Sequence, residues 1–503
     1  MKRILLSIVL LPLVALACAA PQASLVETVP LPSPDSPLVA IRLMFEAGSI
    51  HDPAGKEGLA ALTALMIGEA GSELREYSEL IDALYPMAAA IEVTTDREVT
   101  VIAGEVHREK LAEYAELLRE VVLQPGFRES DFTRNRDQLK TYLTTTLRAS
   151  NDELLGLETL QQVIFAGHPY EHAPEGTVAG LEAITLDDVR AFYAARYTQA
   201  SLMLGVAGGY PEGFVESLAG SFAVLPAGEE AVVELPEPAP VEGRDFTIVE
   251  KPTDSVGIHF GYALPVTRAD DDYYPLAVAN SYLGEHRTFH GRLMKELRGK
   301  RGLNYGDYSY IEHYYAPPFT SLPTPGVPRR DQYFSVWVRP VVPSTAHFAL
   351  RNAIYEVERL IEVGMTQEEL DLTRDFLVNY SKLWAQTLGD RLGFLMDSRF
   401  YGSGYFIDEI ESRLAGLTLE QVNDAVRRHI QADDFQAVIV GADAAGIQAA
   451  IEAGEPSPME YNTPPDPDVI EADKTIEKLA VNPDDFTIVP VDQMFAGGGT
   501  ASE

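Results

Sequence analysis

The chain has 503 residues, which is too long for one hydrophobic core and predicts two or more domains. Hydrophobic residues make up 46% of it and charged residues 23%, ordinary values for a globular protein that argue against wholesale disorder. The formal net charge of -37 argues against a nucleic-acid partner, because the phosphates would be repelled.

The N-terminus has the features of a bacterial export signal. Lys2 and Arg3 precede an apolar run over residues 4–17, and small residues follow it. The run is too short to remain as a membrane-spanning helix. We therefore expect residues 1–18 to be a signal peptide, and the protein to be periplasmic or an outer-membrane-attached lipoprotein of a bacterium.

Cys18 is the only cysteine in the chain and directly follows Ala15-Leu16-Ala17. A cysteine at this place resembles the lipidated cysteine of bacterial lipoproteins, although the usual Leu-Ala-Gly triplet is absent. The same three residues also satisfy a small-x-small cleavage rule, which would release a soluble protein. A lipid anchor at Cys18 is the only membrane attachment that the sequence predicts, because no other apolar stretch reaches membrane-spanning length.

Strand-like and helical segments alternate through the first half of the chain. Apolar runs predict strands over residues 38–45 and 99–106. Helices are predicted over residues 58–67 and 110–123, and the second of these has its apolar residues on one face.

The same order of segments recurs in the second half. Strands are predicted over residues 256–264 and 333–338, and helices over residues 275–283 and 346–363. A further unit, in which a capped helix is followed by an apolar strand, also occurs twice. Residues 183–208 align without a gap with residues 416–441.

This duplication predicts an α+β fold with two homologous α/β-sandwich domains, over residues 25–234 and 246–451. Residues 235–245 hold three prolines and few large apolar side chains, so we expect an extended linker between the domains. The proline-rich residues 452–503 are expected to form an extended C-terminal tail. The apolar residues near its end are expected to dock on the body of the protein.

Several short motifs, taken in their order, resemble the pitrilysin/insulinase metallopeptidase family. The first half carries Ala47-Gly48-Ser49, Gly58-Leu59-Ala60 and Gly167-His168-Pro169-Tyr170, and the second half carries Gly291-Arg292-Leu293 and the segment from Leu297 to Tyr305. The resemblance covers roughly residues 30–450. It implies two repeated peptidase-like halves that form a clamshell of the LuxS/processing-peptidase-like type.

The metal motif of the family is degenerate in this chain. Family peptidases carry His-x-x-Glu-His directly after Gly-Leu-Ala, which places two imidazoles on one helix face for Zn²⁺ and a glutamate beside the bound water. The matching positions are Ala61, Ala64 and Leu65, and the third ligand would fall near Thr141. None of these side chains can bind a metal, so we expect no cofactor in this chain.

A second group of histidines has the spacing of a possible metal site. His286 and His290 are four residues apart and Glu285 lies beside them. Arg287 and Phe289 interrupt the polar face, and no third ligand can be identified. We therefore expect no metal here.

Arg298 and Tyr305 match an arginine and a tyrosine that active family members contribute from the C-terminal half. The resemblance implies that both donate hydrogen bonds to the substrate carbonyl oxygen, and one such donor stabilises the transition state by about 2–4 kcal/mol. The alternative is that Arg298 pairs with a nearby carboxylate such as Glu296, while Tyr305 packs in a strand.

The retained pair and the lost metal motif predict a non-catalytic subunit of a zinc-dependent peptidase heterodimer. Arg298 and Tyr305 would act in the active site of a homologous, zinc-bearing partner, and peptides would be the substrates. The chain would then be inactive alone. Two alternatives remain, namely an inert clamshell scaffold and a peptide-binding protein of the cell envelope. Residues 316–329 form a proline-rich insertion that either lines the chamber or lies on the surface.

Overall fold

The computed structural model describes residues 26–228, 233–314 and 322–497. Cys18 and the predicted signal peptide lie outside these ranges, as do residues 316–321 of the proline-rich insertion. No helix in the described ranges combines the length and apolar character needed to cross a membrane.

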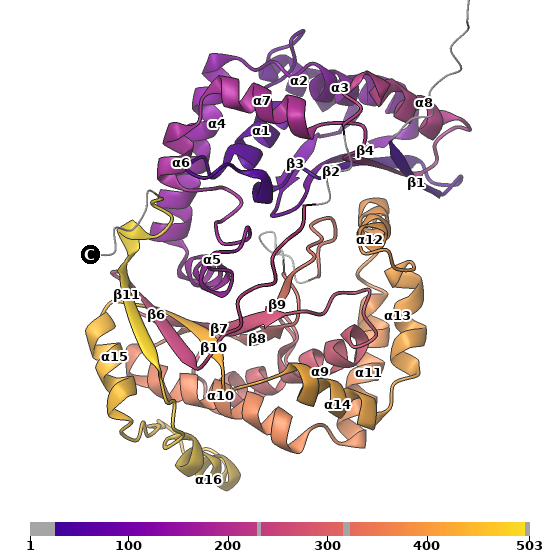
Figure 1. Cartoon of the computed structure of the whole chain (residues 1–503). Coiled ribbons are helices and arrows are strands. Elements are labelled where there is room, and N and C mark those ends of the chain that lie inside the picture. Colours follow the sequence, from indigo (N-terminus) through magenta and orange to yellow (C-terminus); the bar gives the residue numbers. More distant parts are fainter. Residues whose placement is uncertain (1–25, 229–232, 315–321, 498–503) are drawn as a thin grey trace, which may run out of the picture.

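Two halves follow one another along the chain (Figure 1). The first half contains β1 (Glu27–Pro32), β2 (Leu38–Phe45), α1 (Leu59–Gly68), α2 (Tyr77–Leu84), β3 (Glu92–Thr95), β4 (Thr100–His107), α3 (Leu111–Leu123), α4 (Glu129–Thr141), α5 (Asp152–Ile164), α6 (Val178–Ala183), α7 (Leu186–Arg196), β5 (Leu202–Gly208) and α8 (Phe214–Ser221). The second half contains β6 (Arg244–Glu250), β7 (Val256–Leu264), α9 (Tyr273–Gly284), β8 (Asp307–Tyr310), β9 (Gln332–Val341), α10 (Ala346–Val363), α11 (Gln367–Ser381), α12 (Leu388–Phe400), α13 (Phe406–Ala415), α14 (Leu419–His429), β10 (Phe435–Gly441), α15 (Ala444–Ala453), α16 (Pro467–Ile476) and β11 (Asp485–Pro490).

The two sheets have the same topology. The strand order is β1-β5-β2-β4-β3 in the first half and β6-β10-β7-β9-β8 in the second, where β11 is added outside β6. In both sheets the first two strands of this order are parallel and the next pairs are antiparallel. The aligned repeat units are α7 with β5 and α14 with β10. Two domains of mixed helix and sheet are therefore present, as the duplication predicts.

Local signals determine many of the element boundaries. The predicted strands β2 and β7 and the helix α10 have the bounds that the sequence predicts. Capping boxes begin α7, α11 and α14, where a threonine and the residue three positions later satisfy each other's backbone N–H groups. Gly364 ends α10 with a positive φ of 70°.

Each half contributes one helix to the inner face of the other half's sheet. Most helices cover the outer face of their own sheet, whereas α5 and α12 lie between the halves (Figure 1). The first-half helix α5 packs on β7, β10 and β9, and the second-half helix α12 packs on β2, β5 and β1. The halves are therefore joined by a reciprocal exchange of helices.

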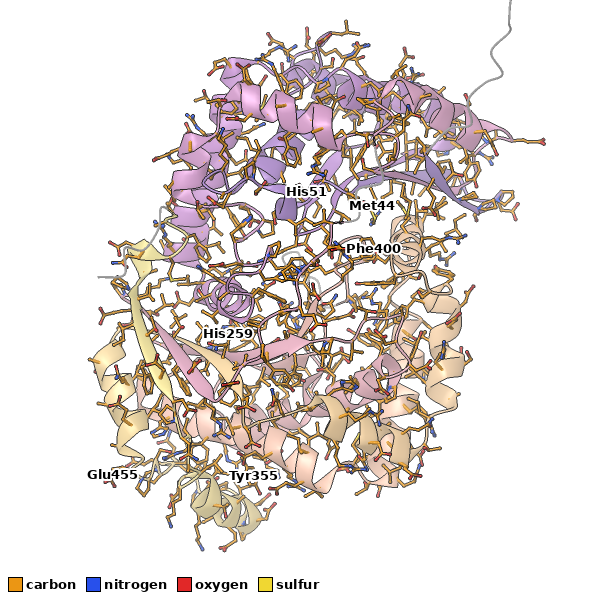
Figure 2. The ribbon with its side chains drawn as sticks, in the orientation of Figure 1. Met44, His51, His259, Tyr355, Phe400 and Glu455 are labelled. Atoms are coloured by element: carbon orange, nitrogen blue, oxygen red, sulfur yellow. The ribbon has the colours of Figure 1, made fainter. Side chains whose placement is uncertain are left out.

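The packing of α12 on the first sheet is apolar. Met44 of β2 lies against Leu392 and Met396 in a small buried cluster, and Phe400 at the end of α12 is packed against it. Figure 2 shows Met44 and Phe400 approaching each other from the two halves. Burying these side chains gives the joint between the halves a hydrophobic driving force.

Two details of the predicted connections differ in the structure. The strand β6 begins at Arg244, inside the segment 235–245 that was predicted to be an extended linker. The tail over residues 452–503 is not extended throughout, because it contains α16 and β11. Its prolines stand at positions that regular structure tolerates, since Pro467 occupies the first turn of α16.

The end of the tail bridges the halves. After pairing with β6 in the second sheet, the chain buries Met494 and Phe495 in the core of the first half. Arg148 donates from Nε to the Met494 carbonyl oxygen at 2.6 Å, and the Val178 N–H donates to the Phe495 carbonyl oxygen at 2.9 Å. The predicted docking of the tail is confirmed.

Candidate functional site

The start of α1 is fixed by a buried carboxyl group. Asp52 accepts hydrogen bonds from the backbone N–H groups of Gly58 and Ala60, each at 2.7 Å. Gly58 caps the helix with a φ of 103°, a conformation that suits glycine. Burial disfavours the charged form and raises the pKa of Asp52 to about 8. These contacts set the direction in which the first turns of α1 present their side chains.

Ala61, Ala64 and Leu65 line one pocket of about 170 Å³. Leu139 of α4 lines the same pocket, two residues before Thr141, where the third family ligand was expected. Thr141 is the last residue of α4, and its hydroxyl donates to the carbonyl oxygen of its own helix four residues earlier. The fold thus brings together α1 and the end of α4, the two elements that carry the matching positions.

The residues of this pocket do not fit a zinc ion. A zinc site needs three protein ligands, and Glu175 is the one side chain lining the pocket that could serve as a ligand. Burial raises the pKa of Glu175 to about 7, so this carboxyl group carries only part of a charge at neutral pH. Throughout the described ranges no group of three or more His, Cys, Asp or Glu side chains could hold a metal ion.

The two histidines at the end of α9 do not share a site. His286 is buried, and its Nδ1 lies 2.6 Å from the Tyr310 hydroxyl. His290, four residues later, is exposed to solvent.

Arg298 and Tyr305 are presented by one tight turn before β8. Arg298 lies in a π-helical turn, Met294–Gly299. The chain then reverses through Gly302, whose φ is 66° and whose N–H donates to the Arg298 carbonyl oxygen at 2.9 Å. Tyr305 follows this reversal, and 79% of it is exposed.

The contacts of Arg298 differ from the alternative in which it pairs with Glu296. Glu296 pairs with Arg292, Lys300 and Arg301, and Arg298 instead lies over the exposed ring of Phe289 at 4.9 Å. Within the described part of the chain, Arg298 has no ion pair and the Tyr305 hydroxyl has no hydrogen bond. A guanidinium and a phenol that keep free donors can bind a developing oxyanion.

Neither Arg298 nor Tyr305 is among the residues that line the pocket of Ala61. The exposed pair and the degenerate motif are therefore separate features of this chain. Tyr305 is exposed and Arg298 is half-buried, so a ligand or another protein could reach the pair.

Residues 29–174 match the insulinase family (peptidase family M16), and residues 183–377 match the M16 inactive domain. The chain belongs to the insulinase family, M16. It is 25% identical over 415 residues to the non-peptidase homolog YmxG of Helicobacter pylori, a match that covers 80% of this chain and 89% of that protein.

Solved M16 structures share the fold. The peptidase M16 inactive domain from Pseudomonas fluorescens superposes with a TM-score of 0.73 at 23% identity, covering 83% of this chain and 96% of that one. A protease from Helicobacter pylori superposes with a TM-score of 0.70 at 17% identity, covering 82% and 96%. The matches to the M16 inactive domain and to a non-peptidase homolog support a non-catalytic member of the M16 family.

Sequence reasoning missed a set of buried ion pairs between the halves. Arg329 is fully buried and donates to Asp96 at 2.7 and 2.6 Å and to Gln161 of α5 at 2.7 Å. The neighbouring Arg330 donates from its N–H and its Nε to Glu98 at 2.6 Å. The described end of the proline-rich insertion therefore lies between the halves and contacts both. Two consecutive arginines directly after the prolines were the available signal.

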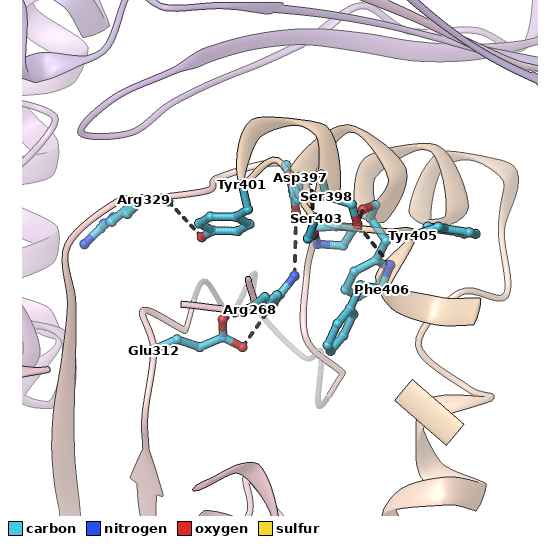
Figure 3. A network of polar contacts seen from close by, with 12 residues as sticks. Arg268, Glu312, Arg329, Asp397, Ser398, Tyr401, Ser403, Tyr405 and Phe406 are labelled. Atoms are coloured by element: carbon cyan, nitrogen blue, oxygen red, sulfur yellow. Dashed lines mark hydrogen bonds and ion pairs between the residues drawn. The ribbon is translucent and has the colours of Figure 1, made fainter. Parts of the chain in front are cut away.

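This network continues into the second half (Figure 3). The Arg329 N–H donates to the Tyr401 hydroxyl at 3.1 Å, and the Gly326 N–H donates to Asp397 at 2.9 Å. Arg268 lies between Asp397 and Glu312, and its bonds to Glu312 measure 3.0 and 3.1 Å. Desolvation raises the pKa of Asp397 to about 6 in spite of this arginine.

Proposed function

We propose that this protein is the zinc-less subunit of a two-chain M16 peptidase. In this proposal Arg298 and Tyr305 bind the substrate carbonyl oxygen in the active site of a homologous partner that carries His-x-x-Glu-His. Peptides are the substrates, and this chain alone is inactive because it has no metal ligands of its own.

The proposal rests on the difference between two sites: the positions that match the metal motif, and the pair formed by Arg298 and Tyr305. At the degenerate motif, Ala61, Ala64 and Leu65 line a pocket and offer no side chain that could bind a metal. At the second site, Arg298 and Tyr305 keep free donors at the surface, although an unpaired guanidinium and an exposed phenol contribute little to folding. Donors that serve no fold-stabilising contact are what a subunit would present to a partner's substrate.

We further propose that the pair of subunits works in the bacterial envelope. The basic residues, apolar run and small residues before position 19 support export, and Cys18 offers a site for a lipid anchor. Metabolic labelling with a fatty acid, compared between the native chain and Cys18→Ser, separates an anchored protein from a released one.

Co-expression tests the proposal. The full chain would be produced with an M16 homologue from the same genome that carries His-x-x-Glu-His, and the complex would be purified through a tag on this chain. We expect a stable complex that contains one zinc per pair of chains and cleaves peptides, whereas this chain alone contains no zinc. Full peptidase activity of the partner without this chain would contradict the proposal.

A further inference from the structure

A cavity of about 70 Å³ lies in the second half, between α9, α11, β8 and the segment after β8. It is separate from the pocket of Ala61 and from the Arg298 turn, because it shares no lining residue with either. The residues that line it include Arg268, Glu285, Tyr310, Glu312, Tyr314 and Trp384. A cavity of this size holds about five water molecules.

Only one of the two glutamates that line the cavity is paired with a cation. Glu312 accepts two bonds from Arg268 and one from the Tyr273 hydroxyl at 2.7 Å, so its charge is neutralised. Glu285 has no ion pair within the described ranges. Burial raises the pKa of Glu285 to about 7, although hydrogen bonds from the Ser281 side chain and the His286 backbone favour its charged form.

Aromatic rings form the wall of the cavity beside Glu285. The hydroxyl of Tyr310 is already bonded to His286, and that of Tyr314 donates to the Leu322 carbonyl oxygen at 3.2 Å. The centroids of these two rings are 5.1 Å apart. Because both hydroxyl groups are already bonded, a ligand would contact the faces and edges of the rings. A carboxylate surrounded by aromatic rings is suited to an ammonium group, which gains both an ion pair and cation–π contacts.

Trp384 also lines this cavity, and its buried indole N–H needs a hydrogen-bond acceptor. Trp384 is only 8% exposed, and its indole Nε1 has no hydrogen-bond partner among the described residues. A buried N–H without a partner is destabilising, and a carboxylate or carbonyl oxygen of a ligand would satisfy it.

We propose that this cavity binds a small free α-amino acid, with its ammonium group at Glu285 and its carboxylate at Trp384. The ammonium group would supply the cation that Glu285 lacks, and the carboxylate would accept from the unpaired Trp384 N–H. The size agrees, because glycine has five heavy atoms and the cavity has room for about five waters.

Tryptophan fluorescence gives a direct test, because the chain has only two tryptophans. In the Trp337→Phe protein, Trp384 is the sole reporter, and we expect a saturable change when glycine or alanine is added. N-acetylglycine lacks the ammonium group and should produce no change. Glycylglycine distinguishes the source of the ligand, since binding of the dipeptide would extend the site to peptide amino termini.

Glu285→Gln should weaken the binding of glycine at least tenfold, whereas Glu116→Gln, an exposed change on α3, should leave it unaltered. If Glu285→Gln does not fold, Tyr314→Leu keeps the carboxyl group, removes one ring and should also weaken binding. Two results would overturn the proposal: no saturable change at tens of millimolar glycine, or unchanged affinity in both cavity variants.

Discussion

At the scale of single residues, His259 shows how closely the exchanged helix α5 fits the second sheet. It is 1% exposed on β7, and neither ring nitrogen has a hydrogen-bond partner within the described ranges. Its ring stacks with Trp337, with 5.9 Å between the ring centroids, and lies against Gly156 of α5. His259 is labelled in Figure 2. Burial without a compensating partner lowers the pKa of His259 to about 3.

His259 should make stability fall as the pH decreases. An unfolded histidine protonates near pH 6.5, while folded His259 stays neutral down to about pH 3, so the unfolded state binds the extra proton between these values. We expect His259→Leu to reduce the dependence of the unfolding free energy on pH in this window by up to about 1.4 kcal/mol per pH unit. Denaturant titrations from pH 7 to pH 4 measure it.

The exposed His107 provides the control, and His107→Leu should leave the pH dependence close to that of the native chain. Equal slopes for the native chain and His259→Leu would mean that the buried histidine is hydrated or paired in solution.

At the scale of elements, glycines mark the two contacts of the exchanged helices. A Cβ at Gly156 in α5 would overlap the ring of His259, and a Cβ at Gly205 in β5 would overlap Met396 of α12. The helix and the strand each use the missing side chain for close approach. The packed interior cannot absorb an added methyl group without movement.

Gly156→Ala should therefore lower the unfolding free energy by about 1–3 kcal/mol, although alanine favours helices. The matched change is Gly220→Ala in α8, where nothing lies near the added methyl group, and it should be neutral or stabilising by up to about 1 kcal/mol. Thermal or urea unfolding of both variants measures the difference. A Gly156→Ala protein as stable as Gly220→Ala would contradict the packing of α5.

The sequence predicts those elements whose apolar pattern is complete within the segment. The strands β2 and β7 are continuous apolar runs that are buried on both faces, and α10 has an apolar stripe and a glycine cap. The strands β1, β6 and β11 were not predicted as strands. They are polar or proline-bearing segments that exist because they pair with a neighbour distant in sequence.

The candidate site also has features that the sequence can predict and features that it cannot. The match of Ala61, Ala64 and Leu65 to the metal motif and the match of Arg298 and Tyr305 to the family's donors rest on ordered motifs and stay predictions. The stacking of Arg298 on Phe289 and the cavity of Glu285 depend on how separate segments pack, which no local pattern contains.

At the scale of the whole molecule, the halves are held together by helix exchange, by buried ion pairs at Arg329 and by the C-terminal tail. The contact of the tail with the first half is the simplest of these to test, because Met494 and Phe495 are the tail residues buried in the first-half core. Phe495 adopts a φ of 52° while its side chain is buried, so packing outweighs local backbone strain there.

Phe495→Ala should lower the unfolding free energy by about 3–5 kcal/mol. It should also speed hydrogen exchange at the Val178 and Ala179 amides, which donate to the tail. Exchange measured by mass spectrometry over α6 reports the local effect, and Phe289→Ala, which changes an exposed ring, serves as control. Unchanged exchange at α6 would show that the tail does not hold the first half.

The proposal of a paired enzyme rests on the donors at Arg298 and Tyr305, and the most direct measurement is kcat of the reconstituted complex. Tyr305→Phe and Arg298→Lys should each lower kcat by about 100-fold, the loss typical of one oxyanion donor, with complex formation and zinc content unchanged. Tyr85→Phe, at a tyrosine 83% exposed, and Arg359→Lys, on the exposed face of α10, should retain full activity. Undiminished kcat in both Tyr305→Phe and Arg298→Lys would contradict the account and leave the chain a scaffold.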